Sequence, residues 1–436
     1  MHRRLGTRVA VAHFSTADLP ERAKTVIIGG GCIGCGIAYS LVKAGEKDVV
    51  VLEKEPALAN VTTAQVHPFK SGMRAAGLVG QVRDNLERVK LAMWSVQTFS
   101  DLQQDSDYNP NWRQVGSLRV AYTKERQEEF NKMLNAGLHV ETLSPKAAQK
   151  MWPGMNFEKA TSILWCPTDG YLQPCDLAFS YQHQSRRMNG AKFVTDAWVE
   201  DIELSPEGTH VKAVKTNRGT IKCDTVINAA GAHAYHIAKL VGLELPIVPV
   251  RHEYFITEPT VPPTITPNLP VMRIPDATLY LRPDVNGLLL GGWEPNGLSL
   301  DPRSYPITQK PPAIAEDWPV LSTLGEELAP TYPQVNELGI RAVFSGWPTF
   351  TPDGRFIIGP TKKVRGFIMA GGCNAHGVSG SAGIGHHVVE SMFEKDPSPY
   401  VRSLSPDRFT DGSWDWDKAE KQARHIYETY YHIRKT

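Results

Sequence analysis

The sequence predicts an α/β fold, α+β overall, in which a Rossmann-like domain built from separated stretches of the chain is joined by a second domain with an antiparallel β-sheet. Three observations predict it. Residues 25–53 have a βαβ pattern around a glycine-rich turn, strands at residues 225–231 and 367–370 enter further small-residue turns, and residues 246–300 hold aromatic-rich strands joined by proline-containing loops.

The βαβ unit is the most specific of these patterns. Its first strand, TVII, enters a turn in which three glycines have the G-x-G-x-x-G spacing: Gly29, Gly31 and Gly34. In such turns the first glycine permits the tight bend, the second lets the backbone approach a pyrophosphate, and the third lets the helix pack on the strand. The N-terminus of the following helix supplies N–H donors and a partial positive charge for the phosphates.

The second strand of the unit ends in Glu53. A carboxylate at this position can accept hydrogen bonds from an adenosine ribose, and an acidic residue there favours FAD or NAD over NADP. A glycine turn alone has a plain structural interpretation, but here the strand, the helix and the acid follow in the order that a dinucleotide site requires.

Later segments extend the same domain. Residues 225–231, TVINAAG, predict a strand that ends in a small-residue turn, and two alternating segments between residues 197 and 216 precede it. Residues 367–370 predict a strand that enters a glycine-rich turn, after which a helix opens around residues 380–384 with its N-terminus able to face an anion. Residues 80–105 predict an amphipathic helix with one apolar face in the core.

The composition indicates a globular protein of more than one structural unit. The chain has 436 residues, 41% of them hydrophobic, and a net charge of +1, which argues against a nucleic-acid partner. No apolar run approaches the ~20 residues of a membrane span, the six cysteines are too sparse for a disulfide framework, and no His/Cys/Asp spacing indicates a metal site. Three arginines precede Asp18, as in a mitochondrial presequence or a disordered bacterial N-terminus. We expect a cytoplasmic protein, with the mitochondrial matrix as the alternative.

Several motifs, in order along the chain, resemble the D-amino-acid-oxidase superfamily of FAD proteins. They are GGGCIGCGIAYSLVKAG, AAGLV, TVINAAG, RHEYFIT, LYLRP, PTFTPDGRFIIGP and AGGCNAHGVSGSAGIG. Within that superfamily they look most like the catalytic portion of dimethylglycine and sarcosine dehydrogenases and of 4-methylaminobutanoate oxidase. The resemblance runs from about residue 24 to the closing YETYYH.

The resemblance implies FAD as the cofactor and oxidation at a carbon next to an amine nitrogen, often N-demethylation. It implies a discontinuous FAD-binding domain at residues 24–110, 166–245 and 345–400, and a substrate-binding domain at residues 111–165 and 246–344. Residues 1–23 would then be an N-terminal extension and residues 401–436 a C-terminal tail.

Two departures from the family pattern carry expectations. The longer dehydrogenases continue into a folate-binding region beyond the point that matches the end of this sequence, so no in-chain module is expected to capture formaldehyde. They also carry a Trp-His pair directly before AAGLV, and that histidine bonds covalently to FAD. Here the segment VHPFKSGMR at residues 66–74 looks like an insertion and leaves Gln65 or Arg74 in that place. We therefore expect non-covalent FAD, with His67 as the one substitute for the attaching histidine.

Two residues are the catalytic candidates. His376 lies in a glycine turn before the last predicted helix, where it could take the amine's proton near the flavin, although capping the helix or bonding the backbone are alternatives. Tyr254 matches the family's His-x-Tyr, and its alternative is a wall aromatic whose hydroxyl is satisfied by backbone.

The candidates for substrate binding are Arg282, Tyr280, His252 and Trp347. Arg282 shares a strand face with Tyr280 and could clamp a carboxylate bidentately, while an exposed strand arginine is the alternative. We expect Tyr254 and Arg282 to face one cavity over the flavin, closed on the other side by the turn that holds His376. Two further arginines are held in reserve: Arg251 and Arg273.

The predicted cofactor-binding residues come from the glycine turn, the end of the second strand and the later small-residue turns. They are Gly29, Gly31, Gly34, Glu53, Lys54, Thr62, Thr63, Val199, Ala230, Gly231, Gly372, Gly377 and Val378.

Three functions remain in competition. The first is FAD-dependent oxidation of a small N-methylated or secondary amino acid by hydride transfer to flavin N5, followed by hydrolysis of the iminium. The second is oxidation of a D-amino or cyclic imino acid, for which formaldehyde is not the expected product. The third is a flavin-binding regulatory subunit without turnover, as relatives of the pyruvate dehydrogenase phosphatase regulatory protein suggest. The expected partners are the amine substrate and an electron acceptor, which could be oxygen, an electron-transfer flavoprotein or a quinone.

Overall fold

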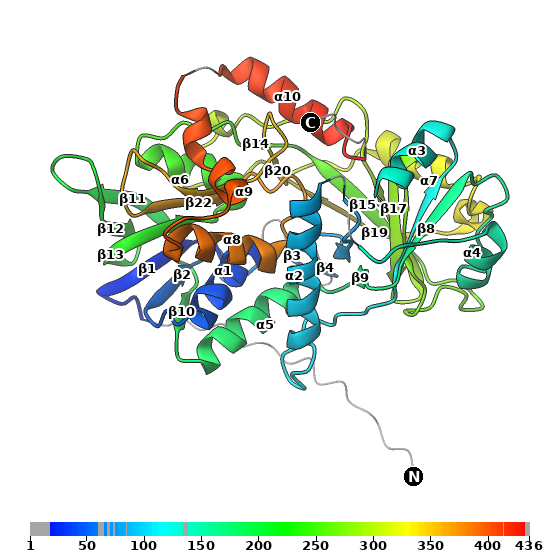
Figure 1. Cartoon of the computed structure of the whole chain (residues 1–436), viewed down its shortest axis with the longest axis horizontal. Coiled ribbons are helices and arrows are strands. Elements are labelled where there is room, and N and C mark those ends of the chain that lie inside the picture. Colours follow the sequence, from blue (N-terminus) through cyan, green and yellow to red (C-terminus); the bar gives the residue numbers. More distant parts are fainter. Residues whose placement is uncertain are drawn as a thin grey trace, which may run out of the picture.

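The computed structural model describes residues 18–59, 65–67, 70–72, 75–83, 85–133, 138–412 and 414–431, and within 65–72 it describes the backbone alone. Two eight-stranded sheets lie side by side, and helices gather around the sheet that contains the N-terminal strand (Figure 1). Among the described residues, none of the helices combines the length and apolarity that crossing a bilayer needs.

The first sheet contains the predicted βαβ unit. Its strand order is β10–β2–β1–β13–β12–β11, with β22 pairing with β13 and with β21. Four strand pairings in this sheet are parallel, as a βαβ architecture requires: β10 with β2, β2 with β1, β1 with β13, and β13 with β22. The strands are β1 (Arg22–Ile28), β2 (Val49–Leu52), β10 (Ala191–Val194), β11 (Val199–Leu204), β12 (Val211–Thr216), β13 (Gly219–Asn228), β21 (Ile357–Pro360) and β22 (Phe367–Gly371).

The inner parallel strands are buried on both faces, which is why β2 reads VVVL and β22 reads FIMAG. On one face Ile27 and Val51 pack with α1, α2, α5 and α8, and on the other Val26 and Val50 pack with α6. The helices are α1 (Cys32–Lys43), α2 (Leu86–Leu102), α5 (Pro174–Arg187), α6 (Ala234–Leu240) and α8 (Ser381–Phe393).

The helix predicted over residues 80–105 is shorter than expected. Asn85 caps it, because its side-chain oxygen accepts from the N–H groups of Glu87 (2.9 Å) and Arg88 (3.3 Å). Two residues of the predicted apolar face are exposed: Leu86 by 49% and Met93 by 43%. The buried face is therefore narrower than the sequence pattern suggested.

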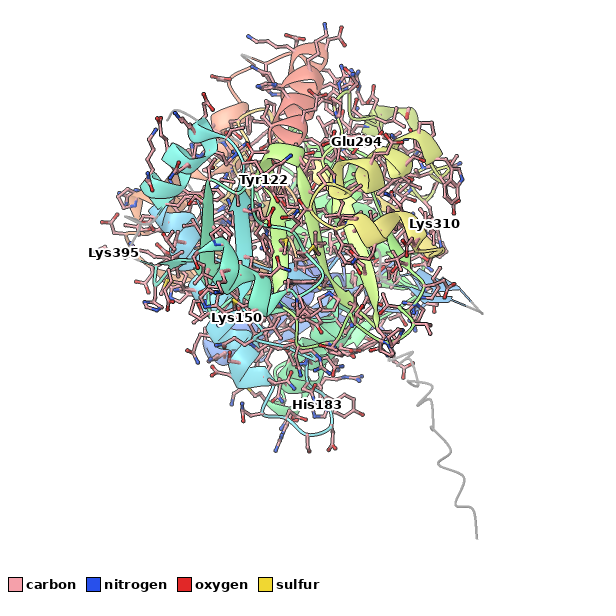
Figure 2. The ribbon with its side chains drawn as sticks, turned by 90° about the vertical axis from the view of Figure 1, so that its right-hand side faces the viewer. Tyr122, Lys150, His183, Glu294, Lys310 and Lys395 are labelled. Atoms are coloured by element: carbon pink, nitrogen blue, oxygen red, sulfur yellow. The ribbon has the colours of Figure 1, made fainter. Side chains whose placement is uncertain are left out.

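The second sheet has the order β19–β15–β18–β17–β16–β6–β8–β7 and is antiparallel except where β16 pairs in parallel with β6. Figure 2 looks onto this half of the molecule, with Tyr122 and Glu294 labelled. The strands are β6 (Ser117–Ala121), β7 (Glu141–Thr142), β8 (Ser162–Cys166), β15 (His252–Thr257), β16 (Val271–Ile274), β17 (Leu279–Asp284), β18 (Gly287–Gly292) and β19 (Ile340–Gly346). The helices around it are α3 (Lys124–Met133), α4 (Pro145–Met151) and α7 (Trp318–Leu328).

The segment predicted as a C-terminal tail forms a packed helix, α10 (Trp416–Glu428), over the β14–β20 pair (Figure 1). Its Trp416 and Tyr427 share a hydrophobic core with Val248 and Phe350. The remaining elements are short: β3 (Gln65–His67), β4 (Lys70–Gly72), β5 (Leu78–Val79), β9 (Gly170–Tyr171), β14 (Val248–Pro249), β20 (Thr349–Phe350) and α9 (Pro399–Ser403). The α/β fold class with a second, mainly antiparallel sheet is confirmed.

Candidate active site

The glycine turn between β1 and α1 is determined by packing and by backbone conformation. Gly29 has a φ of +110°, and a Cβ on it would lie 2.5 Å from the carbonyl oxygen of Ala229. A Cβ on Gly34 would collide with the carbonyl oxygen of Gly29. The protein's own packing therefore requires both glycines. Gly31 is different, because its φ of −77° and ψ of −178° suit any residue.

Two cavities meet at this turn, and Gly31, Ala229 and Gly231 line both of them. The smaller cavity, of about 110 Å³, lies at the carboxyl ends of β1 and β2, where open α/β sheets bind their ligands. Its lining includes most of the predicted cofactor residues: Gly29, Gly31, Glu53, Lys54, Val199, Ala230 and Gly231. This cavity suits the adenosine half of a dinucleotide.

Glu53 organises the smaller cavity. Its two oxygens accept backbone N–H groups, Oε2 from Gly30 (2.8 Å) and Oε1 from Glu55 (2.8 Å). A carboxylate has about four lone-pair sites, so it keeps the capacity to accept from a ribose. Burial raises the pKa of Glu53 to about 7, against the lowering effect of these backbone donors. Beside it, Lys54 donates to the carbonyls of Ile307 (3.0 Å) and Gln309 (2.7 Å). These bonds hold residues 307–310 against the cavity.

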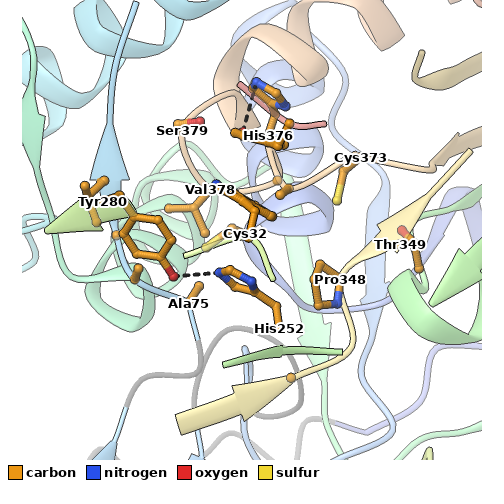
Figure 3. Close-up of a pocket in the computed structure, with 18 of the residues that line it drawn as sticks. Cys32, Ala75, His252, Tyr280, Pro348, Thr349, Cys373, His376, Val378 and Ser379 are labelled. Carbon is orange, nitrogen blue, oxygen red and sulfur yellow. Dashed lines mark hydrogen bonds between the residues drawn. The ribbon is translucent and has the colours of Figure 1, made fainter. Parts of the chain in front are cut away.

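The larger cavity, of about 260 Å³, lies between the two sheets (Figure 3). In Figure 3, Cys32 and Val378, which belong to the half of the molecule with the first sheet, face His252 and Tyr280 of the second sheet. The predicted residues that line it are Gly31, Gly231, His252, Tyr280, Trp347, His376, Gly377 and Val378. Its described lining also contains four arginines and no carboxylate: Arg83, Arg88, Arg119 and Arg273.

The second sheet places three of these side chains in one row. Arg119 on β6 pairs with Arg273 on β16, and Arg273 pairs with Tyr280 on β17. Residues paired directly across strands share a face of the sheet, with Cβ atoms about 5 Å apart. The next position in the row is Gly291, where any side chain would collide with the Tyr280 ring. The row therefore presents one hydroxyl and two guanidinium groups to the same cavity.

A hydrogen-bond chain connects this cavity to a buried carboxylate. Tyr280 Oη lies 2.6 Å from His252 Nε2 (Figure 3), and His252 Nδ1 lies 3.1 Å from Tyr427 Oη. Tyr427 donates its own proton to Glu294. The Tyr427 oxygen therefore accepts from Nδ1–H, which leaves Nε2 to accept from the Tyr280 hydroxyl.

Burial sets the protonation states along the chain. It lowers the pKa of His252 to about 3, raises the pKa of Glu294, and raises the pKa of Tyr280 well above its usual range. His252 is therefore a neutral imidazole at any ordinary pH, and Glu294 is the member of the chain that gains a proton most readily.

His376 occupies the turn between β22 and α8, which Asn374 (φ 44°) and Ala375 (φ 58°) bend through left-handed backbone. Its Nδ1–H donates to the carbonyl of Asn374 (2.7 Å), and its Nε2 lies 3.4 Å from Tyr430 Oη. The ring thus makes the backbone bond considered as its alternative role and also lines the cavity. Its catalytic role stays a prediction. Trp347, also in the lining, donates to the carbonyl of Pro312 (2.8 Å).

The structure does not bring Tyr254 and Arg282 to this cavity, contrary to expectation; neither is among its described lining residues. Arg282 is fully buried, pairs with Asp284 (2.9 Å) and donates to the carbonyl of Ala76 (2.7 Å). Tyr254 is 1% exposed and stacks on Phe344, with ring centroids 5.2 Å apart. Tyr280 and Arg282 share a face of β17, as predicted, but of the two only Tyr280 lies where that face borders the cavity.

The other predicted residues also divide into those that line a cavity and those that do not. Of the reserve arginines, Arg273 lines the cavity, whereas Arg251 forms ion pairs with Asp317 (2.8 Å) and Glu294 (3.5 Å). Gly34 and Gly372 are not among the described lining residues of either cavity and serve the packing of their turns. Some predictions lie outside what the structure describes: Thr62, Thr63, Arg74 and the side chains of Gln65 and His67.

We expect Arg282→Leu to destabilise the protein by about 3–5 kcal/mol, the usual cost of breaking a buried ion pair. The change leaves Asp284 with Arg341 (3.1 Å) as its ion-pair partner among the described residues. Urea unfolding measures the loss, and Arg341→Gln, which removes the half-exposed partner of the same carboxylate, is the matched control with a smaller effect. A fully stable Arg282→Leu protein that binds only carboxylated amines more weakly would restore Arg282 as the substrate anchor.

Sequence reasoning missed several lining residues because they come from segments without a recognisable motif. They are Arg83, Arg88, Arg119, Tyr430 and Tyr431. Tyr430 stacks on Trp293 with ring centroids 3.8 Å apart and closes one wall of the cavity. The cluster of tyrosines in YETYY was the available signal, and alternation in SLRV was the signal for Arg119.

The residues present fit FAD. Gly31 lies at the N-terminus of α1, where backbone N–H groups and the helix dipole favour a pyrophosphate, and it lines both cavities. An acid for the ribose lies on one side of this turn, and a cavity wide enough for a ring system and a small substrate lies on the other. This arrangement is that of a dinucleotide site on a Rossmann-type sheet built from separated stretches of the chain.

The chain belongs to the DAO family of FAD dependent oxidoreductases, whose family model matches residues 24–391. The FAD cofactor predicted from the sequence is thereby confirmed. Dimethylglycine dehydrogenase, mitochondrial, of Homo sapiens is 30% identical over 418 residues, which cover 93% of this chain and 46% of that protein. The 4-methylaminobutanoate oxidase (formaldehyde-forming) of Paenarthrobacter nicotinovorans is 28% identical over 400 residues, which cover 90% of this chain and 46% of that protein.

The chain thus spans about half the length of these relatives. Among solved structures, L-proline dehydrogenase from P. horikoshii has a similar fold, with a TM-score of 0.78 and 25% identity. That match covers 91% of this chain and 100% of the other.

Proposed function

We propose that this protein oxidises a small N-methylated or other secondary amino acid, and that N-demethylation is the reaction. The observation that carries the proposal is the pairing of Arg273 with Tyr280 across β16 and β17, with Tyr280 bonded to His252. A cation for a carboxylate thus lies one strand away from a proton acceptor for an amine. Neighbouring strands are about 4.8 Å apart, a distance that one α-amino acid spans.

Arg273 would bind the substrate carboxylate. It is 8% exposed, lines the cavity, and has no carboxylate partner among the described residues. A buried guanidinium of this kind gains from a charge-assisted, bidentate contact. This role replaces the one expected for Arg282.

Tyr280 and His252 would accept the amine's proton, since the nitrogen must be neutral before a hydride can leave the adjacent carbon. The Tyr280 oxygen takes the proton from nitrogen while its own proton passes to His252 Nε2. In the same concerted step the Nδ1 proton passes to Tyr427, and the Tyr427 proton passes to Glu294. One proton leaves the substrate and one arrives at Glu294, so His252 ends as the other neutral tautomer and no buried imidazolium has to form.

The flavin, when bound, supplies the acceptor for the hydride. The aromatic walls of the cavity, among them Trp293, Trp347 and Tyr430, exclude water from the reacting atoms. The oxidised product is an iminium ion, to which water adds, releasing formaldehyde and the demethylated amine.

A cyclic imino acid is the second candidate, favoured by the fold similarity to an L-proline dehydrogenase. The same carboxylate and proton contacts would serve a ring nitrogen, but no formaldehyde would form. A flavin-binding regulatory subunit without turnover is the third candidate, and any reduction of the flavin by an amine counts against it.

The deciding experiment is an anaerobic screen of amines followed by flavin absorbance near 450 nm. Sarcosine, dimethylglycine, 4-methylaminobutanoate, proline and D-alanine separate the candidates, and a formaldehyde assay on each positive separates demethylation from ring oxidation. Bleaching by an N-methyl amino acid with one formaldehyde per flavin supports the proposal, and no bleaching by any amine refutes it. Readmitting air then tests oxygen as the electron acceptor against an electron-transfer flavoprotein or a quinone.

We also expect the FAD to be non-covalent, because residues 66–74 look like an insertion where the related dehydrogenases carry the attaching histidine. Acid precipitation of the purified protein should release the yellow cofactor into the supernatant. Flavin that remains on the denatured chain would contradict this expectation, and peptide mapping would then test His67.

A further inference from the structure

One end of the larger cavity carries more positive charge than a single amino-acid carboxylate would balance. Arg83, Arg119 and Arg273 all line it, and its described lining contains no aspartate or glutamate. In the described part of the chain, no ion pair joins any of the three to a carboxylate. Buried cations without a counter-ion are costly, so the site favours an anionic ligand.

Contacts among these residues hold the guanidinium groups close together. Arg83 (2.9 Å) and Arg119 (3.3 Å) both donate to the carbonyl of Val82. Arg119 is 7% exposed, and its Nε is buried without a hydrogen-bond partner. Burial, and then the nearby charges of Arg273 and Arg83, lower the pKa of Arg119 to about 10. The three cations therefore repel one another, and a bound anion would relieve that repulsion.

The carboxylate of Asp169, whose charge acts on both Arg83 and Arg119, does not supply that anion. Asp169 is 1% exposed and accepts from the backbone N–H of Gln81 (2.9 Å) and from the hydroxyl of Ser117 (2.5 Å). It is not among the described residues that line the cavity. Its electrostatic effect on Arg119 ranks below those of Arg273 and Arg83.

We propose that the substrate carries a second acidic group, which Arg119 and Arg83 bind one strand spacing beyond the carboxylate held by Arg273. The order along the row is Tyr280, Arg273 and Arg119, and each step is one strand spacing of about 4.8 Å. An N-substituted amino acid with a short acidic side chain carries an amine, an α-carboxylate and a second carboxylate, one group for each member of the row. This inference rests on the proposed function, in which Tyr280 receives the amine.

The test compares unreactive ligands of equal length on the holoenzyme. Glutarate has two carboxylates and pentanoate has one on the same five carbons. Binding is followed by the flavin spectrum and by tryptophan fluorescence, because Trp293 and Trp347 line the cavity. We expect glutarate to bind at least about tenfold more tightly than pentanoate, the effect of one charge-assisted contact. Equal binding of the two acids overturns the proposal, whatever the variants do.

Arg83→Gln, at a half-buried position, should reduce this preference to about threefold or less, while Arg187→Gln, at an exposed position on α5, should leave it unchanged. An equal loss for both acids would show that Arg83 is structural and would contradict the proposal. The matched substrates are N-methylglutamate and N-methylnorvaline, which differ only in the terminal carboxylate. If both reduce the flavin equally well, the second acidic site is wrong and the proposal of amine oxidation stands. If neither reduces it although glutarate is preferred, the site stands and amine oxidation fails.

Discussion

Gly31→Val is expected to give a folded protein that purifies with little or no flavin. Gly31 adopts ordinary backbone angles, so valine is not excluded by conformation. It lines both cavities at the N-terminus of α1, and a branched side chain there would stand where a pyrophosphate must approach the backbone. The ratio of absorbance at 450 nm to that at 280 nm measures the loss, and circular dichroism checks the fold.

Two other glycines supply the controls. Gly325→Val in α7 places the same side chain where a Cβ would have no neighbour within 4 Å, so its flavin content should stay normal. Gly29→Val should instead impair folding, because of the φ of +110° and the close carbonyl of Ala229. A Gly31→Val protein with full flavin content would show that the phosphate turn has been assigned to the wrong residue.

Tyr280→Phe is expected to slow reduction of the flavin by substrate by about 10²- to 10⁴-fold, the usual contribution of a positioned proton acceptor. The change removes the hydroxyl that bonds His252 Nε2 and keeps the ring that fills the space beside Gly291. Substrate affinity should change little, because the carboxylate contact proposed for Arg273 is left intact. Anaerobic stopped-flow measurements separate the rate of reduction from binding.

The pH dependence distinguishes a chemical role of Tyr280 from a structural one. Burial lowers the pKa of His252 to about 3, so this ring stays neutral above pH 5 and contributes no acid limb to the profile. The rate should rise with pH as the amine loses its proton, and the deficit of Tyr280→Phe should shrink as that ionisation removes the need for an acceptor. Tyr122→Phe, directly after β6, removes a hydroxyl bonded to Thr331 and should match wild type. A deficit that is constant with pH would argue for a purely structural effect.

The parts of the site that sequence alone predicted are those built from consecutive residues. The turn from Gly29 to Gly34 and the acid at Glu53 lie within one βαβ unit, so spacing alone determines their relation. His376 likewise follows from a strand, a turn and a helix that are adjacent in sequence.

The arginine row could not be predicted because it depends on strand pairing between distant segments. Arg119 meets Arg273 only through the parallel pairing of β6 with β16, and no local pattern specifies that register. Alternation correctly placed Tyr280 and Arg282 on one face of β17. Alternation does not predict that Tyr171 and Asp284 cover Arg282 while Tyr280 lines the cavity, because the packing of the whole domain determines those neighbours.

The row of paired residues across the second sheet also sets fixed distances between the groups that line the cavity. Strand spacing is set by backbone hydrogen bonds and varies little, so neighbouring positions in the row are separated by a nearly constant distance. Under the proposed roles, a substitution at position 119 or 273 changes which chain length or charge is accepted and leaves every strand in place. If the proposed roles hold, relatives with the same strand pairing are expected to differ in the acids that they bind according to the residues at these two positions.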